Sequence, residues 1–328
     1  MEGAVPEDRD PAPPATVSEV GEFAVIEHIL AGRPEGAGVA VGPGDDAAVV
    51  DTPDGRAVLC TDMLVEGRHF RLDWSTPHDV GRKAIAQNAA DIEAMGARPT
   101  AFVVAFGVPP STAASRVREL ADGLWCEAGL LGAAVVGGDL VASPQWVVSV
   151  TALGDLGGRA PVTRGGARAG SVIAVAGHLG WSAAGLELLR RGIGVTLPEH
   201  RRHLVPEPPY GQGAVAADAG AEAMTDVSDG LLADLGHLAE ASGVLMDLSR
   251  DALAGDVEAV TAAARVAGAD PWSLVLTGGE DHALVACFPG PPPPGWRVVG
   301  RVRPGRPAVL LDGQHRSGPS GWQAFDPQ

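Results

Sequence analysis

Aspartates set among glycine and alanine are the residues of this chain whose types and spacing could do chemistry. They stand in G-P-G-D-D-A-A-V at 42–49, C-T-D at 60–62, N-A-A-D at 88–91, V-G-G-D at 136–139 and T-D-V-S-D-G at 225–230. Carboxylates are poor core formers but good ligands for hard cations, and Mg²⁺ prefers oxygen donors while it bridges to phosphates. The pattern predicts a magnesium-dependent enzyme of phosphoryl transfer.

Each of these segments also has an ordinary structural explanation. Asp45 and Asp46 suit a turn, because Asp and Gly are favoured there for backbone reasons. Asp91 would be an exposed residue of a helix. Ser228 or Asp229 would cap the helix that follows, an arrangement that is itself a natural anion site. The chemical interpretation therefore rests on the segments taken together.

Charge and composition exclude several classes of protein. The formal net charge of −17 argues against a nucleic-acid partner, since such binding depends on clustered Lys and Arg. The only lysine, Lys83, stands in G-R-K-A-I-A and not in a P-loop. An EF-hand is excluded because Gly230 is fifth from Asp226, where that loop needs glycine at position six. Phosphate charge must be met by Mg²⁺, arginine and backbone amides.

The chain has the features of a cytoplasmic protein. Its three cysteines, Cys60, Cys126 and Cys287, lack the short spacing of zinc or redox motifs. The N-terminus has no secretory signal, and glycines and a histidine interrupt the most apolar stretch, so we expect no membrane span. Residues 1–17 are rich in proline and acidic side chains, which predicts a disordered tail.

Hydrophobic spacing predicts the elements that position the first aspartates. Apolar residues at 23, 26, 29 and 30 indicate a first helix. The runs at 47–51 and 56–62 flank P-D-G and predict a hairpin whose second strand ends at Asp62. Pro77 would begin a helix that reaches Met95 and carries Asn88 and Asp91 one turn apart.

The next segments follow β-α-β order. A buried strand at 101–108, a helix from Ser111 and a strand ending at Asp139 are expected, then a strand from Trp146 to Leu153. Asp62 and Asp139 would thus stand at the ends of strands, where ligands of open α/β sheets collect.

The segment 157–170 is rich in glycine and charge and is the predicted boundary between two α/β domains. We expect an N-terminal domain at 18–156 and a C-terminal domain at 157–328. The second would start with a strand at 171–176 and a helix at 182–191, and a further helix would open at Ser228 and Asp229.

The order and spacing of these segments resemble the thiamine-monophosphate kinase family, part of the superfamily that includes aminoimidazole ribonucleotide synthetase. The resemblance covers the chain from Gly21 to Trp322. It rests on T-D-M-L-V-E-G-R-H-F, K-A-I-A-Q-N-A-A-D-I-E-A-M-G-A, T-R-G-G-A, D-V-S-D-G-L and G-G-E-D, together with G-P-G-D-D-A and G-G-D.

The resemblance implies ATP-dependent phosphorylation of thiamine monophosphate to thiamine diphosphate. It also implies three sets of site residues. Several Mg²⁺ ions would be held by Asp46, Thr61, Asp62, Asp91, Asp139, Asp226 and Asp229. ATP would contact Gly138, Asp139, Arg164 and Ser228. Thiamine monophosphate would meet His69, Glu280 and Trp322. No general base is expected, because a phosphate oxygen is already ionised at neutral pH.

The resemblance further implies a two-domain aminoimidazole ribonucleotide synthetase-like fold. Its N-terminal sheet would pair with a second copy, giving a homodimer with the active site in a cleft between domains.

Two positions depart from the family pattern. Cys60 stands where a hydroxyl residue is common, and its thiol is unsuited to Mg²⁺. His282 stands where an aromatic residue is common, which could change packing in the substrate pocket.

Two rival interpretations stay open. One is another activity of the superfamily, selenophosphate synthesis or closure of the aminoimidazole ring, although an N-terminal reactive Cys or Sec is absent. The other is a silent nucleotide-binding module kept for dimerisation or regulation.

Overall fold

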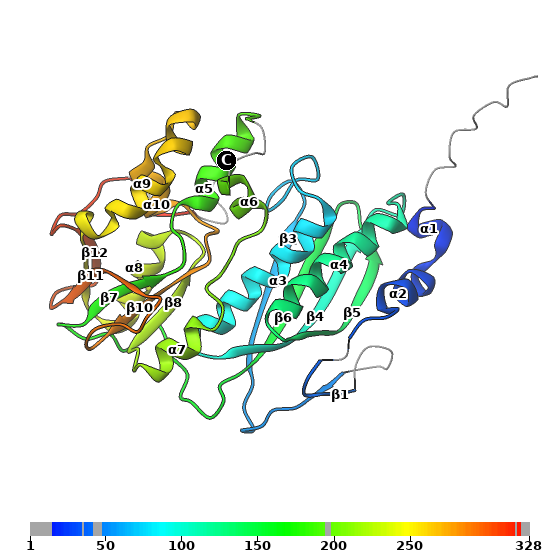
Figure 1. The fold of residues 1–328 in the computed structure, drawn as a ribbon, viewed down its shortest axis with the longest axis horizontal. Coiled ribbons are helices and arrows are strands. Elements are labelled where there is room, and N and C mark those ends of the chain that lie inside the picture. The colour runs from blue at the N-terminus through cyan, green and yellow to red at the C-terminus, as the bar shows by residue number, and fades with distance from the viewer. Residues whose placement is uncertain (1–14, 35, 42–47, 194–197, 319, 323–328) are drawn as a thin grey trace, which may run out of the picture.

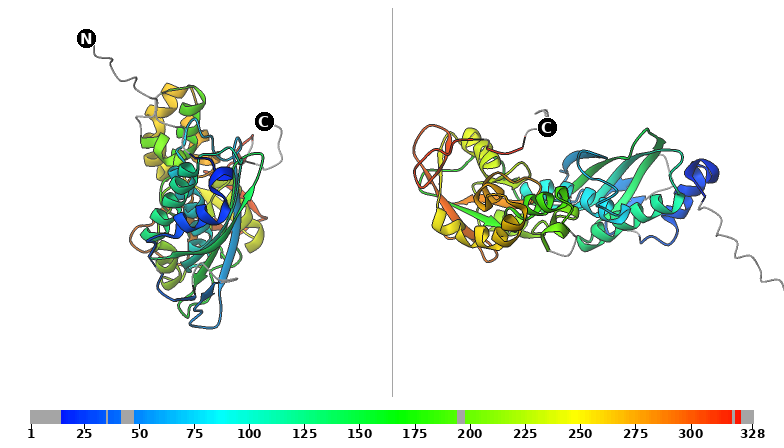
Figure 2. Two further views of the ribbon diagram at one scale, coloured as in Figure 1. Left: turned by 90° about the vertical axis from the view of Figure 1, so that its right-hand side faces the viewer. Right: turned by 90° about the horizontal axis from the view of Figure 1, so that it is seen from above.

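The structure is a computed structural model that describes residues 15–34, 36–41, 48–193, 198–318 and 320–322 (Figure 1). Asp46, one of the predicted metal ligands, and most of the predicted tail lie outside these residues. The described strands form a four-stranded sheet, a six-stranded sheet and a two-stranded ribbon. The mixed α/β class predicted from the sequence is confirmed, and the two larger sheets lie side by side in an elongated molecule (Figure 2).

The four-stranded sheet has the order β3-β6-β4-β5, and only β4 and β5 run parallel. Its strands are β3 (Val58–Val65), β4 (Arg98–Val108), β5 (Ala134–Ala142) and β6 (Val147–Asp155). Helices α3 (Pro77–Ala94) and α4 (Ala114–Leu130) cover one face. The unit β4-α4-β5 confirms the predicted β-α-β order.

The N-terminal segment contributes small elements at the edge of this sheet. They are α1 (Val17–Val20), α2 (Glu22–Leu30), β1 (Val39–Val41) and β2 (Val49–Val50). Helix α2 confirms the predicted first helix. The predicted hairpin is wrong, because β2 pairs with β1 and β3 pairs with β6. The P-D-G turn joins strands of different sheets.

Two strands run further than the sequence suggested. Asp62 and Asp139 were expected at strand ends, but β3 continues to Val65 and β5 to Ala142. The reason is packing: Leu64 and Leu140 point into the core and are only 1% and 7% exposed. Burial of these leucines repays the cost of extending each strand, so both aspartates lie within strands.

Helix α3 lies at the junction of the two halves (Figure 2). It begins with a capping box in which Thr76 and Asp79 exchange hydrogen bonds, and Pro77 takes the first helical position. Most of its 18 residues are buried, far more than the single stripe of an ordinary surface helix. Glycines bring α4 close, since a Cβ at Gly123 would lie 2.0 Å from the His78 carbonyl oxygen.

The six-stranded sheet has the order β12-β9-β11-β7-β10-β8, with only β12 and β9 parallel. Its strands are β7 (Val172–Ala176), β8 (Ala223–Val227), β9 (Leu245–Leu248), β10 (Ala283–Phe288), β11 (Arg297–Arg303) and β12 (Ala308–Leu311). The helices of this half are α5 (Trp181–Arg190), α6 (Pro198–Leu204), α7 (Gln212–Asp218), α8 (Leu231–Ser242), α9 (Arg250–Ala267) and α10 (Pro271–Thr277).

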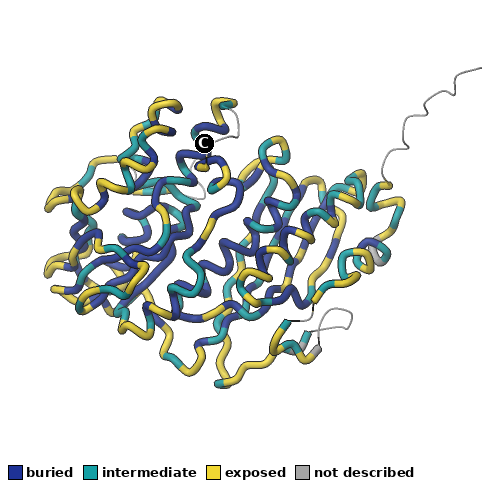
Figure 3. Tube along the Cα trace, in the orientation of Figure 1, coloured by how far each residue is buried: buried dark blue, intermediate teal, exposed yellow. Residues whose placement is uncertain are grey.

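Helices α5, α8, α9 and α10 pack on one face of this sheet, while α7 and the end of α3 meet the other face. Buried residues follow the strands and the inner sides of these helices (Figure 3). The predicted strand at 171–176 and helix at 182–191 are confirmed by β7 and α5. No helix in the described part of the chain combines the length and apolar character needed to cross a bilayer.

Candidate functional site

Asp62 faces α3 from the edge strand β3. Its backbone N–H donates to Asn88 Oδ1 at 3.1 Å, and Gln87 Nε2 donates to its carboxylate at 3.3 Å. Asn88 is itself fixed, because its amide donates to the Ala84 carbonyl within α3 at 2.9 Å. The strand and the helix thus hold the Asp62 carboxylate at the junction of the two halves.

Asp91 and Asp226 bring two further carboxylates to Asp62. Burial, together with the nearby charges of Asp226 and Asp62, raises the pKa of Asp91 to about 7. Asp226 is 3% exposed at the end region of β8, and His282 Nδ1 lies 3.1 Å from its carboxylate. Three elements far apart in sequence therefore meet here.

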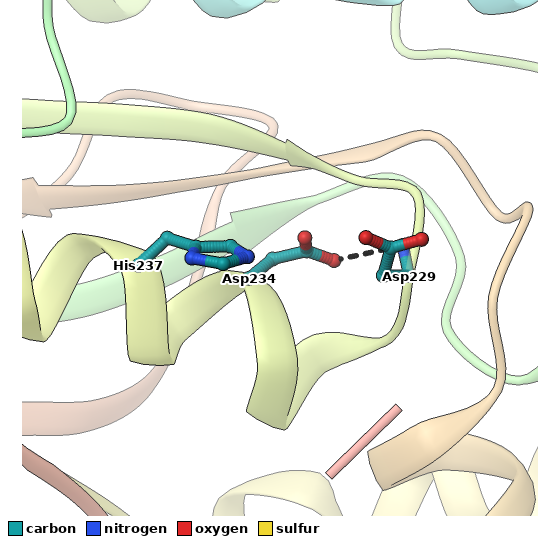
Figure 4. Close-up of side chains that lie close together, drawn as sticks. All are labelled: Asp229, Asp234 and His237. Atoms are coloured by element: carbon teal, nitrogen blue, oxygen red, sulfur yellow. Dashed lines mark hydrogen bonds between the residues drawn. The ribbon is translucent and has the colours of Figure 1, made fainter. Parts of the chain in front are cut away.

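The loop after β8 extends this group of carboxylates (Figure 4). Asp234 accepts hydrogen bonds from the backbone N–H groups of Asp229 and Gly230, at 3.1 and 3.0 Å. Burial raises the pKa of Asp234 to about 7, with contributions from Asp226 and Asp229. Burial and Asp226 also raise the pKa of Asp229. We call Asp62, Asp91, Asp226, Asp229 and Asp234 the acidic cluster.

Helix α8 starts differently from the prediction. It was expected to open at Ser228 and Asp229 with one of them as its cap, but its N-cap is Gly230 and it begins at Leu231. The Asp234 carboxylate performs the capping from inside the first turn, since it reaches back to the N–H groups of Asp229 and Gly230. The Asp229 side chain therefore does not cap α8.

Asp234 and His237 were missed by the sequence reasoning. Ligand atoms of Asp229, Asp234 and His237 lie within 4.8 Å of one another, which makes this trio a possible metal-holding group among the described residues. Asp234 and His237 are three residues apart on α8 and therefore share one face of the helix. This spacing was the signal in the sequence that could have identified them.

The acidic cluster fits hard cations. It supplies carboxylate oxygens, the donors that Mg²⁺ prefers, and the raised pKa values of Asp91 and Asp234 show that their charges are not balanced by the protein. Cys60 lies beside it, but burial raises the pKa of its thiol strongly, so it stays protonated. Oxygen ligands with uncompensated charge are what a bound divalent cation requires.

A second group of charged residues lies next to the acidic cluster and is balanced. Lys83 Nζ donates to Glu280 Oε2 at 3.2 Å and to the carbonyl oxygens of His69 and His203 at 3.1 and 3.2 Å. Burial by itself would raise the pKa of Glu280, but Lys83, His203 and His282 lower it to about 2. We call Lys83, His203 and Glu280 the lysine cluster.

Two of the predicted substrate residues contribute to this second group, and the third contacts the loop of Asp229. Glu280 belongs to it directly, and His69 contributes its carbonyl oxygen. The Trp322 backbone N–H donates to the Asp229 carbonyl at 2.9 Å, and its ring lies 5.2 Å from the guanidinium of Arg68. Residues 320–322 thus return to the loop that follows β8, beside the acidic cluster.

Two predicted ATP contacts lie near the acidic cluster. The Ser228 carbonyl accepts the Glu280 N–H at 2.7 Å, so the T-D-V-S-D-G and G-G-E-D loops run side by side. Arg164 is close enough for its charge to lower the pKa of Asp229 against the larger effect of burial.

Other predicted site residues direct their side chains away from Asp62 or lie on a different strand. The Thr61 hydroxyl donates to the Val150 carbonyl at 3.0 Å on the open face of the sheet. Gly138 and Asp139 lie on β5, the opposite edge strand, and alternation with buried Leu140 puts the Asp139 side chain on the open face. Gly138 is required there, because a Cβ would lie 2.1 Å from the Val104 carbonyl oxygen.

Comparison with known proteins identifies the family. Residues 44–156 match the model of the AIR synthase related protein, N-terminal domain. The chain is 64% identical to thiamine-monophosphate kinase of Mycobacterium tuberculosis H37Rv, with 94% of this chain and 93% of that protein covered. Identity to the Corynebacterium glutamicum thiamine-monophosphate kinase is 45%, over 94% of this chain and 95% of that protein.

Solved structures give the same result. Thiamine-monophosphate kinase from Stenotrophomonas maltophilia K279a superposes with a TM-score of 0.76 at 31% identity, covering 89% of this chain and 97% of that one. AaThiL complexed with AMPPCP and TMP gives 0.73 at 30% identity, covering 94% and 98%. The chain belongs to the thiamine-monophosphate kinase family, within the AIR synthase-like superfamily.

Proposed function

We propose that this protein transfers the γ-phosphoryl group of ATP to thiamine monophosphate and releases thiamine diphosphate and ADP. The observation that carries the proposal is the meeting of the acidic cluster with the lysine cluster at the junction of the two halves. Carboxylates with uncompensated charge suit the cations that accompany ATP. The similarity to AaThiL, whose structure contains AMPPCP and TMP, supports the same pair of substrates.

Mg²⁺ would be held by Asp62, Asp91, Asp226 and Asp229, and these cations would neutralise charge on the crowded phosphates. Thr61 and Asp139 remain predicted ligands whose side chains this arrangement directs away from Asp62. Asp46 remains a predicted ligand that lies outside the described residues. Asp234 would support the group by fixing the backbone of Asp229. Gly138, Asp139, Arg164 and Ser228 remain the predicted contacts of ATP.

The chain's residues would act by binding and orientation in a direct in-line transfer. The acceptor oxygen belongs to a phosphate that is ionised at neutral pH, so no side chain is needed to remove a proton. Alignment of the two phosphates is then the main task, and fixed geometry such as the Asn88 contact to Asp62 serves it.

Thiamine monophosphate would lie against His69, Glu280 and Trp322. Its thiazolium ring is cationic, so a carboxylate and the face of an indole are suitable neighbours. Glu280 stays ionised over the whole physiological range because its pKa is held near 2.

The open face of the four-stranded sheet supports a homodimer. Strand alternation puts four large apolar side chains on the face that α3 and α4 leave uncovered. They are Leu59 (63% exposed), Met63 (53%), Val103 (38%) and Val141 (51%). Large apolar side chains gathered on one face mark interaction sites. Pairing of this face with a second copy would cover them. The three cysteines are free, which fits the cytoplasm as the proposed compartment.

The test is product formation with purified protein, ATP, Mg²⁺ and thiamine monophosphate, with thiamine diphosphate followed by chromatography. We expect product from the wild type and a loss of at least about a hundredfold in kcat for Asp62→Asn, because its carboxylate is a proposed metal ligand. Asp251→Asn, an exposed change in α9, serves as the matched control and should keep full activity.

Two results would count against the proposal. ATP binding without thiamine diphosphate formation would favour a silent nucleotide-binding module. Turnover of ATP with a different acceptor would favour another activity of the superfamily.

A further inference from the structure

Lys83, the only lysine of the chain, is buried at the junction of the two halves with 2% of its surface exposed. Its ammonium donates to three oxygens from three segments: the His69 carbonyl, the His203 carbonyl and Glu280 Oε2. An ammonium has three N–H groups, so each of them has a partner. Lys83 therefore occupies one fixed position.

The three contacts of Lys83 are unequal in what they fix. The His69 loop has its own bonds, because His69 Nδ1 accepts from the Val65 N–H at 3.0 Å and the His69 N–H donates to the Val65 carbonyl at 3.0 Å. His203 belongs to α6, whose helical backbone is also set independently. These two carbonyls hold the ammonium in place, and the ammonium in turn holds Glu280.

Glu280 needs such support. Its φ of 63° is in the left-handed region that side chains other than glycine rarely adopt, so the backbone there is strained. Its carboxylate is approached at Oε2 by both Lys83 and His203 Nδ1, at 3.2 and 3.3 Å. The side chain is nevertheless 32% exposed, so a ligand can reach it.

We propose that Lys83 is a positioning residue that fixes the Glu280 carboxylate for contact with the cationic organic part of the acceptor. This inference rests on the proposed function, since it takes Glu280 as a contact of thiamine monophosphate. Lys83 reaches Glu280 from α3, which also carries Asp91. One helix therefore positions both a carboxylate of the acidic cluster and the ammonium that orients Glu280. A compact ammonium suits this task, because a planar guanidinium could not reach three converging oxygens in so small a space.

The experiment measures KM for thiamine monophosphate and KM for ATP in Lys83→Met. We expect KM for thiamine monophosphate to rise about tenfold or more, because Glu280 loses the charged partner that orients it. KM for ATP should change less than about twofold. The matched control is Arg82→Met on the same helix, which breaks the 2.6 Å contact with buried Glu127 and does not touch the lysine cluster. It should lower stability without changing either KM.

A double variant keeps the test decisive if Lys83→Met does not fold. Lys83→Met/Glu280→Gln removes charge from both sides of the contact and should fold better than the single change. If Lys83 acts through Glu280, the double variant and Glu280→Gln will share the same KM for thiamine monophosphate within about twofold. A further rise in the double variant, or an unchanged KM in Lys83→Met, overturns the inference while the kinase function stands. A wild type that forms no thiamine diphosphate overturns the proposed function and this inference together.

Discussion

The acidic cluster and the lysine cluster lie side by side but are opposite in their electrostatics. In the first, burial and neighbouring carboxylates raise the pKa of Asp91 and Asp234 to about 7. In the second, Lys83 and His203 overcome the effect of burial and lower the pKa of Glu280 to about 2. The charge of the acidic cluster is not balanced by the described residues, whereas the charges of the lysine cluster balance one another.

His282 joins the two clusters. Its Nδ1 lies 3.1 Å from the Asp226 carboxylate, and its charge also helps to lower the pKa of Glu280. The φ of 51° at His282 shows that the backbone is strained here too. The ring nitrogen of His282 makes a contact with Asp226 that a hydrocarbon ring such as that of phenylalanine could not make.

Asp91→Asn should have the largest effect on the acidic cluster, because it removes a charge that the protein itself does not balance. We expect kcat to fall at least about a hundredfold. The metal-free protein should become more stable by about 1 kcal/mol, because repulsion from Asp62 and Asp226 is relieved. Steady-state kinetics and thermal unfolding in EDTA measure the two effects, with Asp251→Asn as control. Loss of both activity and apo stability would mean that Asp91 is a structural residue.

Added Mg²⁺ should stabilise the protein more at about pH 7.5 than at about pH 5.5. A carboxyl whose pKa is raised from 3.8 to about 7 contributes stability below its unfolded pKa, and this contribution is lost as the pH rises through 7. Near pH 7.5 the carboxylates of the acidic cluster are therefore ionised and repel one another. Saturating Mg²⁺ should raise the free energy of unfolding there by about 2–3 kcal/mol.

The lysine cluster should respond in the opposite direction. Glu280 contributes stability above about pH 4.5, and this contribution is lost as the pH falls through 2. Thermal unfolding with and without Mg²⁺ at about pH 5.5 and 7.5 reports on the acidic cluster, because Glu280 stays ionised at both pH values. The same measurement below about pH 4.5 reports on the lysine cluster. An Mg²⁺ effect that is equal at both pH values would refute the assignment of unbalanced charge to Asp91 and Asp234.

Trp322→Ala tests the segment that returns to the junction of the clusters. The ring is 41% exposed and touches Arg68, while its backbone bond to Asp229 survives the substitution. We expect KM for thiamine monophosphate to rise about fivefold through loss of a cation-binding face, and unfolding free energy to change by less than about 0.5 kcal/mol. Kinetics and chemical denaturation provide the two numbers. Unchanged KM would place Trp322 outside the substrate site.

Thr61→Val should have the smallest effect and sharpens the contrast with its neighbour Asp62. The Thr61 hydroxyl is directed to the open face and bonded to the Val150 carbonyl. We expect kcat to fall less than about threefold, since a neutral hydrogen bond contributes little net free energy. A loss as large as that of Asp62→Asn would show that the hydroxyl reaches the metals, which would require a second copy to complete the site.

Local signals in the sequence predicted the helices better than the strands. Pro77 after Thr76 marks the start of α3, and the apolar run at 101–108 marks β4. The hairpin around P-D-G was wrong because a turn motif says nothing about which strand is the partner. β3 pairs instead with β6, about ninety residues further along the chain. Such long-range pairing depends on burial of the whole sheet and not on a local turn.

The sequence by itself determined the α/β class, the exclusion of a P-loop and the set of aspartates that could bind cations. Only the tertiary structure decided which aspartates meet: Asp62, Asp91 and Asp226 come together, while Asp139 lies on the far edge strand. The tertiary structure also brings three oxygens within hydrogen-bond distance of the Lys83 ammonium, and it lets the Asp234 carboxylate cap the start of α8. The physical reason is that residue type and spacing fix local geometry, whereas proximity and pKa depend on burial and on charges brought from distant segments.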